Sequence, residues 1–130
     1  STGIDTVQQI LAIAAGGAVG AVLRFVLSNG IYRMVGRDFP YGTLAVNVLG
    51  SLMMGFLFIT MVERQIVSAE WRAAVLVGLL GAFTTFSTFS METIALLEDG
   101  EILRAMLNIV LSILFCLAAT WIGISVGRQL

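Results

Sequence analysis

The sequence predicts an all-α integral membrane protein, with four transmembrane helices in a single domain over residues 1–130. Two observations support this fold class. Hydrophobic residues make up 58% of the chain and the mean hydropathy is +1.00. The apolar residues also fall into four segments, each with about the 20 residues that a helix needs to cross a bilayer. The connections between them are too short for a soluble domain, so the function must lie in or at the membrane.

The four segments are bounded by polar and turn-forming residues. Pro40 stands just before the second segment, where a proline can open a helix without breaking it. Asp99 and Gly100 predict a turn between the third and fourth segments. The predicted spans are approximately Ile10–Leu27, Leu44–Val62, Ala73–Met91 and Ala105–Gly127. The predicted connections are 28–43, 63–72 and 97–104.

Composition excludes several classes of function. Charged residues are 12% of the chain and the net charge is −1, so no basic footprint for nucleic acid is present. The sequence has no histidine, which removes the usual metal ligand and proton relay. Cys116 is the only cysteine, so no disulfide forms within the chain. Composition alone therefore indicates only a small polytopic membrane protein.

The arginines are divided almost evenly between the two sides of the membrane. Four spans place three of them on one side, Arg64, Arg72 and Arg128, and four on the other, Arg24, Arg33, Arg37 and Arg104. An excess of basic residues on the cytoplasmic side normally sets orientation. The even division predicts a chain that inserts in both orientations and pairs antiparallel, or it reflects only chance in a short sequence. The residues alone leave both interpretations open.

Small residues recur at four-residue spacing in three of the spans. This spacing lets helices approach closely in a membrane and predicts tight packing, including packing between subunits. The rows are Ala12, Gly16 and Gly20, then Ser51 and Gly55, then Gly123 and Gly127.

Residues 81–90, Gly-Ala-Phe-Thr-Thr-Phe-Ser-Thr-Phe-Ser, place hydroxyls and phenylalanines together inside an apolar span. Hydroxyls in lipid must bond to the backbone, to each other or to something that passes through. Phenylalanines spaced by three share one face of a helix. Glycine is unfavourable in helix interiors, so Gly78 and Gly81 followed by two threonines predict a break in the third helix. Freed carbonyls would suit a hard cation, whereas N–H groups and hydroxyls would suit an anion.

Other polar side chains within the spans each have two interpretations. Asn47 either donates to an anion or joins two helices, because a bare carboxamide is costly in lipid. Arg24 either extends to the headgroups or attracts anions at a vestibule. Glu92 can bond to a hydroxyl or cap a half-helix. Asn108, Ser112 and Cys116 share one face of the fourth span, where they line a path or pack against another helix.

The motif of residues 81–90, together with Gly42-Thr43-Leu44-x-x-Asn47 and Gly50, resembles the Fluc (CrcB) fluoride channel family over essentially the whole chain. The resemblance implies an antiparallel, dual-topology homodimer with two pores that prefer fluoride to chloride. It also implies a structural sodium ion (Na+) at the dimer interface. The expected role is passive export of cytoplasmic fluoride across the bacterial inner membrane.

The resemblance also implies roles for particular residues. Phe86 and Phe89 match the pore phenylalanines of the family, Ser87 and Thr88 its polar track, and Asn47 its pore asparagine. Gly81 and Thr84 match the residues whose backbone carbonyls bind sodium. Arg24 is the expected vestibule residue, and Ser112 is the expected pore residue of the fourth span. Asn108 and Cys116 depart from the family, where tyrosine and serine are common.

Two other functions compete with the channel. A small proton-coupled exporter of cationic drugs with dual topology has a similar size and charge balance. That class needs a carboxylate within the first span, which residues 10–27 lack. In the third interpretation the chain is a non-transporting assembly subunit, and the hydroxyl and aromatic cluster only packs. Fluoride flux separates the channel from both.

Overall fold

The computed structural model describes residues 3–130, and its regular secondary structure in that range is entirely helical. Four helical segments are long and apolar enough to cross a membrane, which confirms the predicted four spans: Asp5–Val35, Tyr41–Glu63, Ala69–Glu98 and Ile102–Gln129. They comprise α1 (Gly3–Val35), α2 (Tyr41–Leu57), η1 (Phe58–Glu63), α3 (Ala69–Arg72), η2 (Ala73–Leu79), α4 (Leu80–Phe83), α5 (Phe86–Glu98) and α6 (Ile102–Gln129). Here η1 and η2 are π-helical turns.

The predicted connection over residues 28–43 was wrong in extent. Helix α1 continues through Gly30 to Val35, since no proline occurs before Pro40. Gly36 has a φ of +85°, a conformation that glycine adopts without steric cost and that ends helices. Pro40 immediately precedes α2 at its N-cap position, so it opens the helix as predicted. Gly100, with a φ of +78°, lies in the predicted turn, which is shorter than expected because α6 begins at Ile102.

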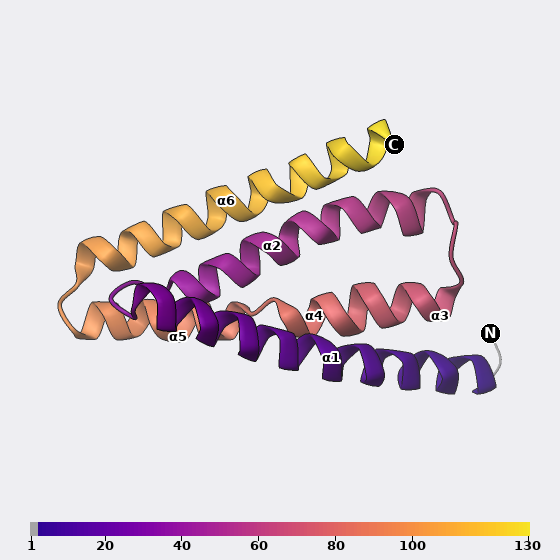
Figure 1. Cartoon of the computed structure of the whole chain (residues 1–130), viewed down its shortest axis with the longest axis horizontal. Helices are drawn as coiled ribbons and strands as arrows, with labels where there is room; N and C mark the ends of the chain where they lie inside the picture. Colours follow the sequence, from indigo (N-terminus) through magenta and orange to yellow (C-terminus); the bar gives the residue numbers. More distant parts are fainter. Residues whose placement is uncertain (1–2) are drawn as a thin grey trace.

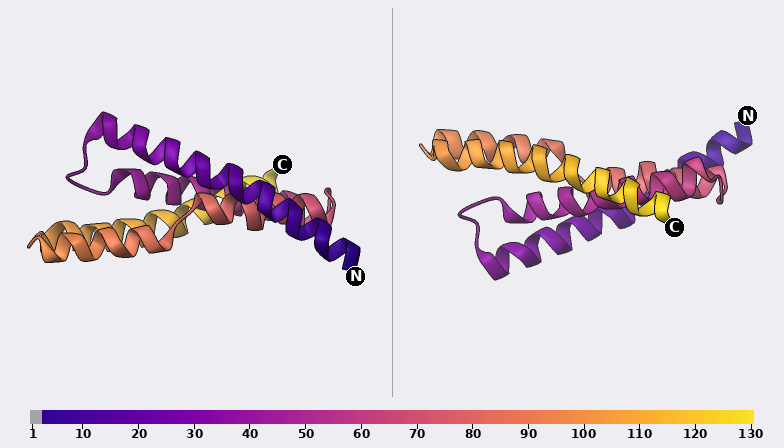
Figure 2. Two further views of the ribbon diagram at one scale, coloured as in Figure 1. Left: turned by 90° about the horizontal axis from the view of Figure 1, so that it is seen from below. Right: turned by 90° about the horizontal axis from the view of Figure 1, so that it is seen from above.

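The four segments run alternately up and down (Figure 1). The start of α1, the connection that precedes α3 and the end of α6 lie at one end of the bundle, and the α5–α6 turn lies at the other. Figure 2 shows that the α1–α2 pair and the α5–α6 pair diverge toward the end that holds this turn. The positions of the arginines at the ends of the spans follow from the element bounds. Arg64 follows η1 and bonds to the Gly127 carbonyl, so it lies at the same end as Arg128 and as Arg72 at the end of α3. Arg104 bonds to the Asp38 carbonyl, so it lies at the other end with Arg33 and Arg37.

Small residues let the helices of one chain approach closely, which confirms the predicted tight packing. A Cβ atom on Gly20 would overlap the Leu79 carbonyl, so the lack of a side chain at Gly20 lets α1 pack closely against η2. Between α2 and α6 the contact is reciprocal. A Cβ on Gly55 would overlap the Thr120 carbonyl, and one on Gly123 would overlap the Leu52 carbonyl. These glycines therefore set the separation of the helices.

Two residues of the third segment have extended backbone between α4 and α5. Thr84 has a ψ of 155°, and Thr85 has φ and ψ of −150° and 116°. Gly78 and Gly81 are themselves helical, so the irregular conformation begins at the threonines and not at the glycines. Thr85 is the N-cap of α5, because its hydroxyl accepts the Thr88 N–H at 3.2 Å.

Candidate functional site

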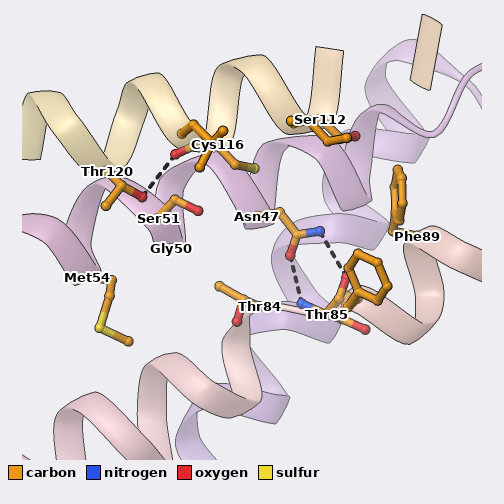
Figure 3. A pocket seen from close by; sticks show the side chains of 13 residues that line it. Asn47, Gly50, Ser51, Met54, Thr84, Thr85, Phe89, Ser112, Cys116 and Thr120 are labelled. Atoms are coloured by element: carbon orange, nitrogen blue, oxygen red, sulfur yellow. Dashed lines mark hydrogen bonds between the residues drawn. The ribbon is translucent and has the colours of Figure 1, made fainter. Parts of the chain in front are cut away.

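A pocket of about 390 Å³ lies between α2, the Thr84–Thr85 segment, α5 and α6 (Figure 3). Among the residues that the structure describes, its lining contains no aspartate, glutamate, lysine or arginine. The lining comprises Asn47, Gly50, Ser51, Met54, Thr84, Thr85, Phe86, Phe89, Ser112, Ile113, Cys116, Leu117 and Thr120. The pocket therefore brings together four of the predicted pore residues, Asn47, Phe86, Phe89 and Ser112.

Asn47 connects α2 to the extended segment through both atoms of its amide (Figure 3). Its Oδ1 accepts the Thr85 N–H at 2.7 Å, and its Nδ2 donates to the Thr85 carbonyl at 2.9 Å. This pairing determines which amide atom faces which backbone group. Because an amide nitrogen carries two protons, Asn47 keeps one further N–H for another acceptor. Asn47 thus joins two helices and still lines the pocket with a donor.

The same pairing changes the backbone hydrogen bonds of the third segment. In a continuous helix the Thr85 N–H would bond to the Gly81 carbonyl, but here Asn47 accepts it. The Leu80 carbonyl accepts from both the N–H and the hydroxyl of Thr84, at 3.1 and 3.0 Å. Asn47 therefore stabilises the extended conformation and leaves the Gly81 carbonyl without its usual helical donor.

Arg24 lies beside the same segment. Its Nε donates to the Ala82 carbonyl at 3.0 Å, near the C-terminal end of α4. In the structure, Arg24 is therefore bonded within the protein and does not extend toward the lipid headgroups. The arginine turns toward a carbonyl that has lost its helical donor, where a cation is favourable. Arg24 consequently does not belong with the arginines at the ends of the spans.

Comparison with known proteins identifies the family. Residues 11–124 match the family described as CrcB-like protein, Camphor Resistance (CrcB). The chain belongs to this family. The motif of residues 81–90 therefore predicted the family correctly.

Three relatives of the chain share the name Fluoride-specific ion channel FluC. The protein of Methylococcus capsulatus is 59% identical over 94% of this chain, which spans 54% of that relative's length. The Hydrogenovibrio crunogenus protein is 52% identical over 95% of this chain and 93% of its own length. The Geobacter sulfurreducens protein is 51% identical over 93% of this chain and 98% of its own length. The chain thus spans about half of the first relative and nearly all of the other two. With its four spans, it is a multi-pass bacterial membrane protein.

The spacing of Phe83, Phe86 and Phe89 predicted that all three share one helix face, but in this CrcB-like chain only Phe86 and Phe89 line the same pocket. The rings of Phe86 and Phe89 pack with centroids 5.4 Å apart and planes inclined by 41°. Phe83 is buried and lines a different groove, against α1 and α2. The prediction failed for Phe83 because the extended residues separate it from the helix that carries Phe86 and Phe89.

Ser87 and Thr88 are not part of the pocket lining. They lie at the start of α5, where the Thr85 hydroxyl donates to Thr88 Oγ1 at 3.0 Å and is 3.3 Å from Ser87 Oγ. Among the polar residues of the lining, sequence reasoning did not assign Ser51 and Thr120 to the site. The signal was present, because Ser51 follows Asn47 by four residues and Thr120 follows Cys116 by four, which places each pair on one helix face.

Glu92 bonds to a hydroxyl, as one of its two interpretations expected, but the partner comes from α1. The Tyr32 hydroxyl donates to Glu92 Oε2 at 2.8 Å and accepts the Thr43 N–H at 3.2 Å. The Arg37 guanidinium lies 4.5 Å from the centre of the Tyr32 ring. This cluster ties α1, α2 and α5 together at the end of the bundle that holds the α5–α6 turn.

Proposed function

We propose that the chain is a fluoride-selective channel, through which cytoplasmic fluoride leaves the cell passively. The observation that carries this proposal is the pocket lining, which offers an amide N–H, aromatic rings and hydroxyls without a charged side chain among the described residues. Fluoride is small and strongly hydrated, so a selective pore must replace its water with donors such as Asn47, and with the positive edges of Phe86 and Phe89. A fixed cation in the pore would hold the anion too tightly. The relatives' name points to the same ion.

Efflux from sealed vesicles tests this function. Purified protein is reconstituted into vesicles loaded with fluoride or chloride, and an ion-selective electrode records release after a potassium ionophore clamps the potential. We expect fluoride release within seconds to minutes and retention of chloride. A steady fluoride current in planar bilayers without a proton gradient would establish passive conduction. Fluoride release no faster than from protein-free vesicles would contradict the proposal.

The proton-coupled exporter is disfavoured because residues 6–35 of α1 contain no carboxylate. The non-transporting subunit predicts no flux at all. The inner membrane of bacteria is the expected location, because its negative-inside potential drives an anion outward.

The proposed assembly is an antiparallel homodimer with two pores. Phe86 lines the pocket but is 78% exposed in the single chain, so one side of the pocket lacks a protein wall. Gly81 is exposed nearby, with no atom within 4 Å of a Cβ built on it. The three arginines at each end support dual orientation, since neither end has the excess that fixes insertion. A second, inverted copy would complete both pockets.

The proposed dimer would hold a structural sodium ion between the carbonyls of Gly81 and Thr84 and their symmetry copies. The residues present fit this role. Asn47 has taken the donor that the Gly81 carbonyl would bind in a helix, and unpaired carbonyls are costly in a membrane. Four hard oxygen atoms suit a hard cation. In this proposal the discontinuity of the third helix supplies the sodium ligands on one side and the pore donors on the other.

A further inference from the structure

Asn108 of α6 lies directly behind the pocket wall. It is only 2% exposed, and its amide bonds to side chains of two helices. Its Nδ2 donates to Thr93 Oγ1 of α5 at 2.9 Å, and its Oδ1 accepts from Ser112 Oγ at 3.3 Å. Ser112 lines the pocket, whereas Asn108 does not. Asn108 is thus bonded to a lining hydroxyl without facing the pocket itself.

The direction of these hydrogen bonds follows from Thr93. The Thr93 hydroxyl donates its single proton to the Phe89 carbonyl at 2.7 Å, so toward Asn108 it can only accept. Asn108 must therefore turn Nδ2 to Thr93, which leaves Oδ1 facing Ser112. An amide oxygen is an acceptor only, so Ser112 is the donor in that bond. The Ser112 proton is directed at Asn108, which is not part of the pocket lining.

We propose that Asn108 competes with the permeating anion for the Ser112 hydroxyl proton, and so weakens anion binding at this point of the pore. An anion can use Ser112 only after the hydroxyl rotates. Rotation leaves the buried Oδ1 of Asn108 without its donor, which is unfavourable in a setting of low polarity. The inference deepens the proposed function and rests on it, because the competing ligand is the fluoride of that pore.

This competition matters for throughput. A pore must bind its ion well enough to replace water and weakly enough to release it. An unengaged Ser112 hydroxyl would be a permanent donor in the pocket lining. The bond to Asn108 makes the same donor available only at a cost. Asn108 is therefore a positioning residue that acts through Ser112. By weakening anion binding there, it lowers the occupancy of the pore by the anion and raises the rate at which the anion is released.

The test is a double-mutant cycle. Asn108→Leu keeps a similar volume and removes the acceptor, and it is made both in the wild type and in a Ser112→Ala background. The measurement is the fluoride concentration that gives half-maximal current in planar bilayers. In the wild-type background we expect this concentration to fall by about three- to tenfold, since one hydrogen bond is released to the anion. Maximal current should fall as well, and in the Ser112→Ala background the change in half-maximal concentration should vanish.

The matched control is Asn29→Leu, which removes an asparagine of α1 whose amide oxygen accepts from Arg37 at 3.4 Å. It should leave the half-maximal concentration unchanged. Asn108→Ala provides a second variant that cannot clash, and it should shift the concentration in the same direction. A role limited to joining α5 and α6 predicts equal effects with and without the Ser112 hydroxyl, and that result would overturn the proposal. A wild-type protein that conducts no fluoride would overturn the proposed function, and this inference with it.

Discussion

Phe86 and Phe89 are the aromatic side chains of the pocket, and their tilted contact leaves ring edges for an anion. We predict that Phe86→Ile and Phe89→Ile each reduce fluoride efflux by at least tenfold. Isoleucine retains most of the apolar volume but has no positive ring edge. Size-exclusion chromatography should show unchanged assembly. Fluoride efflux at the wild-type rate in both variants would show that the two phenylalanines serve only in packing.

Asn47 has a second role besides lining the pocket, and its substitution by aspartate affects both roles. Asn47→Asp keeps an acceptor for the Thr85 N–H but loses the donor to the Thr85 carbonyl, which costs about 1–3 kcal/mol when that group is buried. The added carboxylate also repels an anion. We therefore predict lower thermal stability together with abolished fluoride efflux. Asn29→Asp on α1 is the control and should retain efflux.

At the scale of elements, the helices of one chain are held together by close backbone contacts. We predict that Gly123→Ala lowers stability by about 1–3 kcal/mol, because the added methyl group would overlap the Leu52 carbonyl of α2. Gly30→Ala is the matched control, since its Cβ would meet no atom within 4 Å. That change should be neutral or stabilising by up to about 1 kcal/mol. Thermal unfolding in detergent measures both, and equal effects would contradict the contact.

The sequence predicted those elements that depend on local signals. Four apolar segments, Pro40 at the start of α2 and the Asp99-Gly100 turn need only the residues themselves. The length of α1 was underestimated because Gly36, and not the polar residues after Leu27, ends it.

Within the site, spacing identified residues that share a face, but not what that face contacts. One pocket contains Asn47, Phe86, Phe89 and Ser112, which the family resemblance assigned to the pore. The pairing of Asn47 with Thr85 could not be predicted, because it joins residues of two helices 38 positions apart. The position of Asn108 behind Ser112 likewise depends on the rotation of α6 against α5, which periodicity does not determine.

At the scale of the whole molecule, the even division of arginines between the two ends gives a prediction for topology. Gln65→Lys with Ile66→Lys adds two charges to the connection between η1 and α3, where both side chains are exposed. We expect the variant to insert in one orientation and to lose most of its fluoride efflux, since antiparallel pairs then become rare. Co-expression with an oppositely biased variant should restore it. The neutral pair Gln65→Asn and Ile66→Gln is the control, and one orientation for the wild type in cysteine labelling would contradict dual topology.

The proposed sodium site gives the second prediction for the assembly. If two copies surround one ion with the carbonyls of Gly81 and Thr84, the ion replaces hydrogen bonds that the extended segment has lost. Its removal should therefore weaken the dimer as well as conduction. We predict that prolonged dialysis into a large organic cation lowers the thermal stability of the dimer and abolishes fluoride current. Sodium, but not the organic cation, should restore both.

Elemental analysis supplies a measure of the same site that does not depend on current. The purified dimer should retain about one sodium ion per two chains after rapid exchange into sodium-free buffer, because four carbonyl ligands in a closed site release a cation slowly. Asn47→Leu removes the acceptor that holds the Thr85 N–H away from the Gly81 carbonyl. That variant should allow the helical bond to form, and it should retain less sodium than the wild type. Equal sodium in both proteins, or none in the wild type with full dimer stability, would show that these carbonyls do not bind the ion.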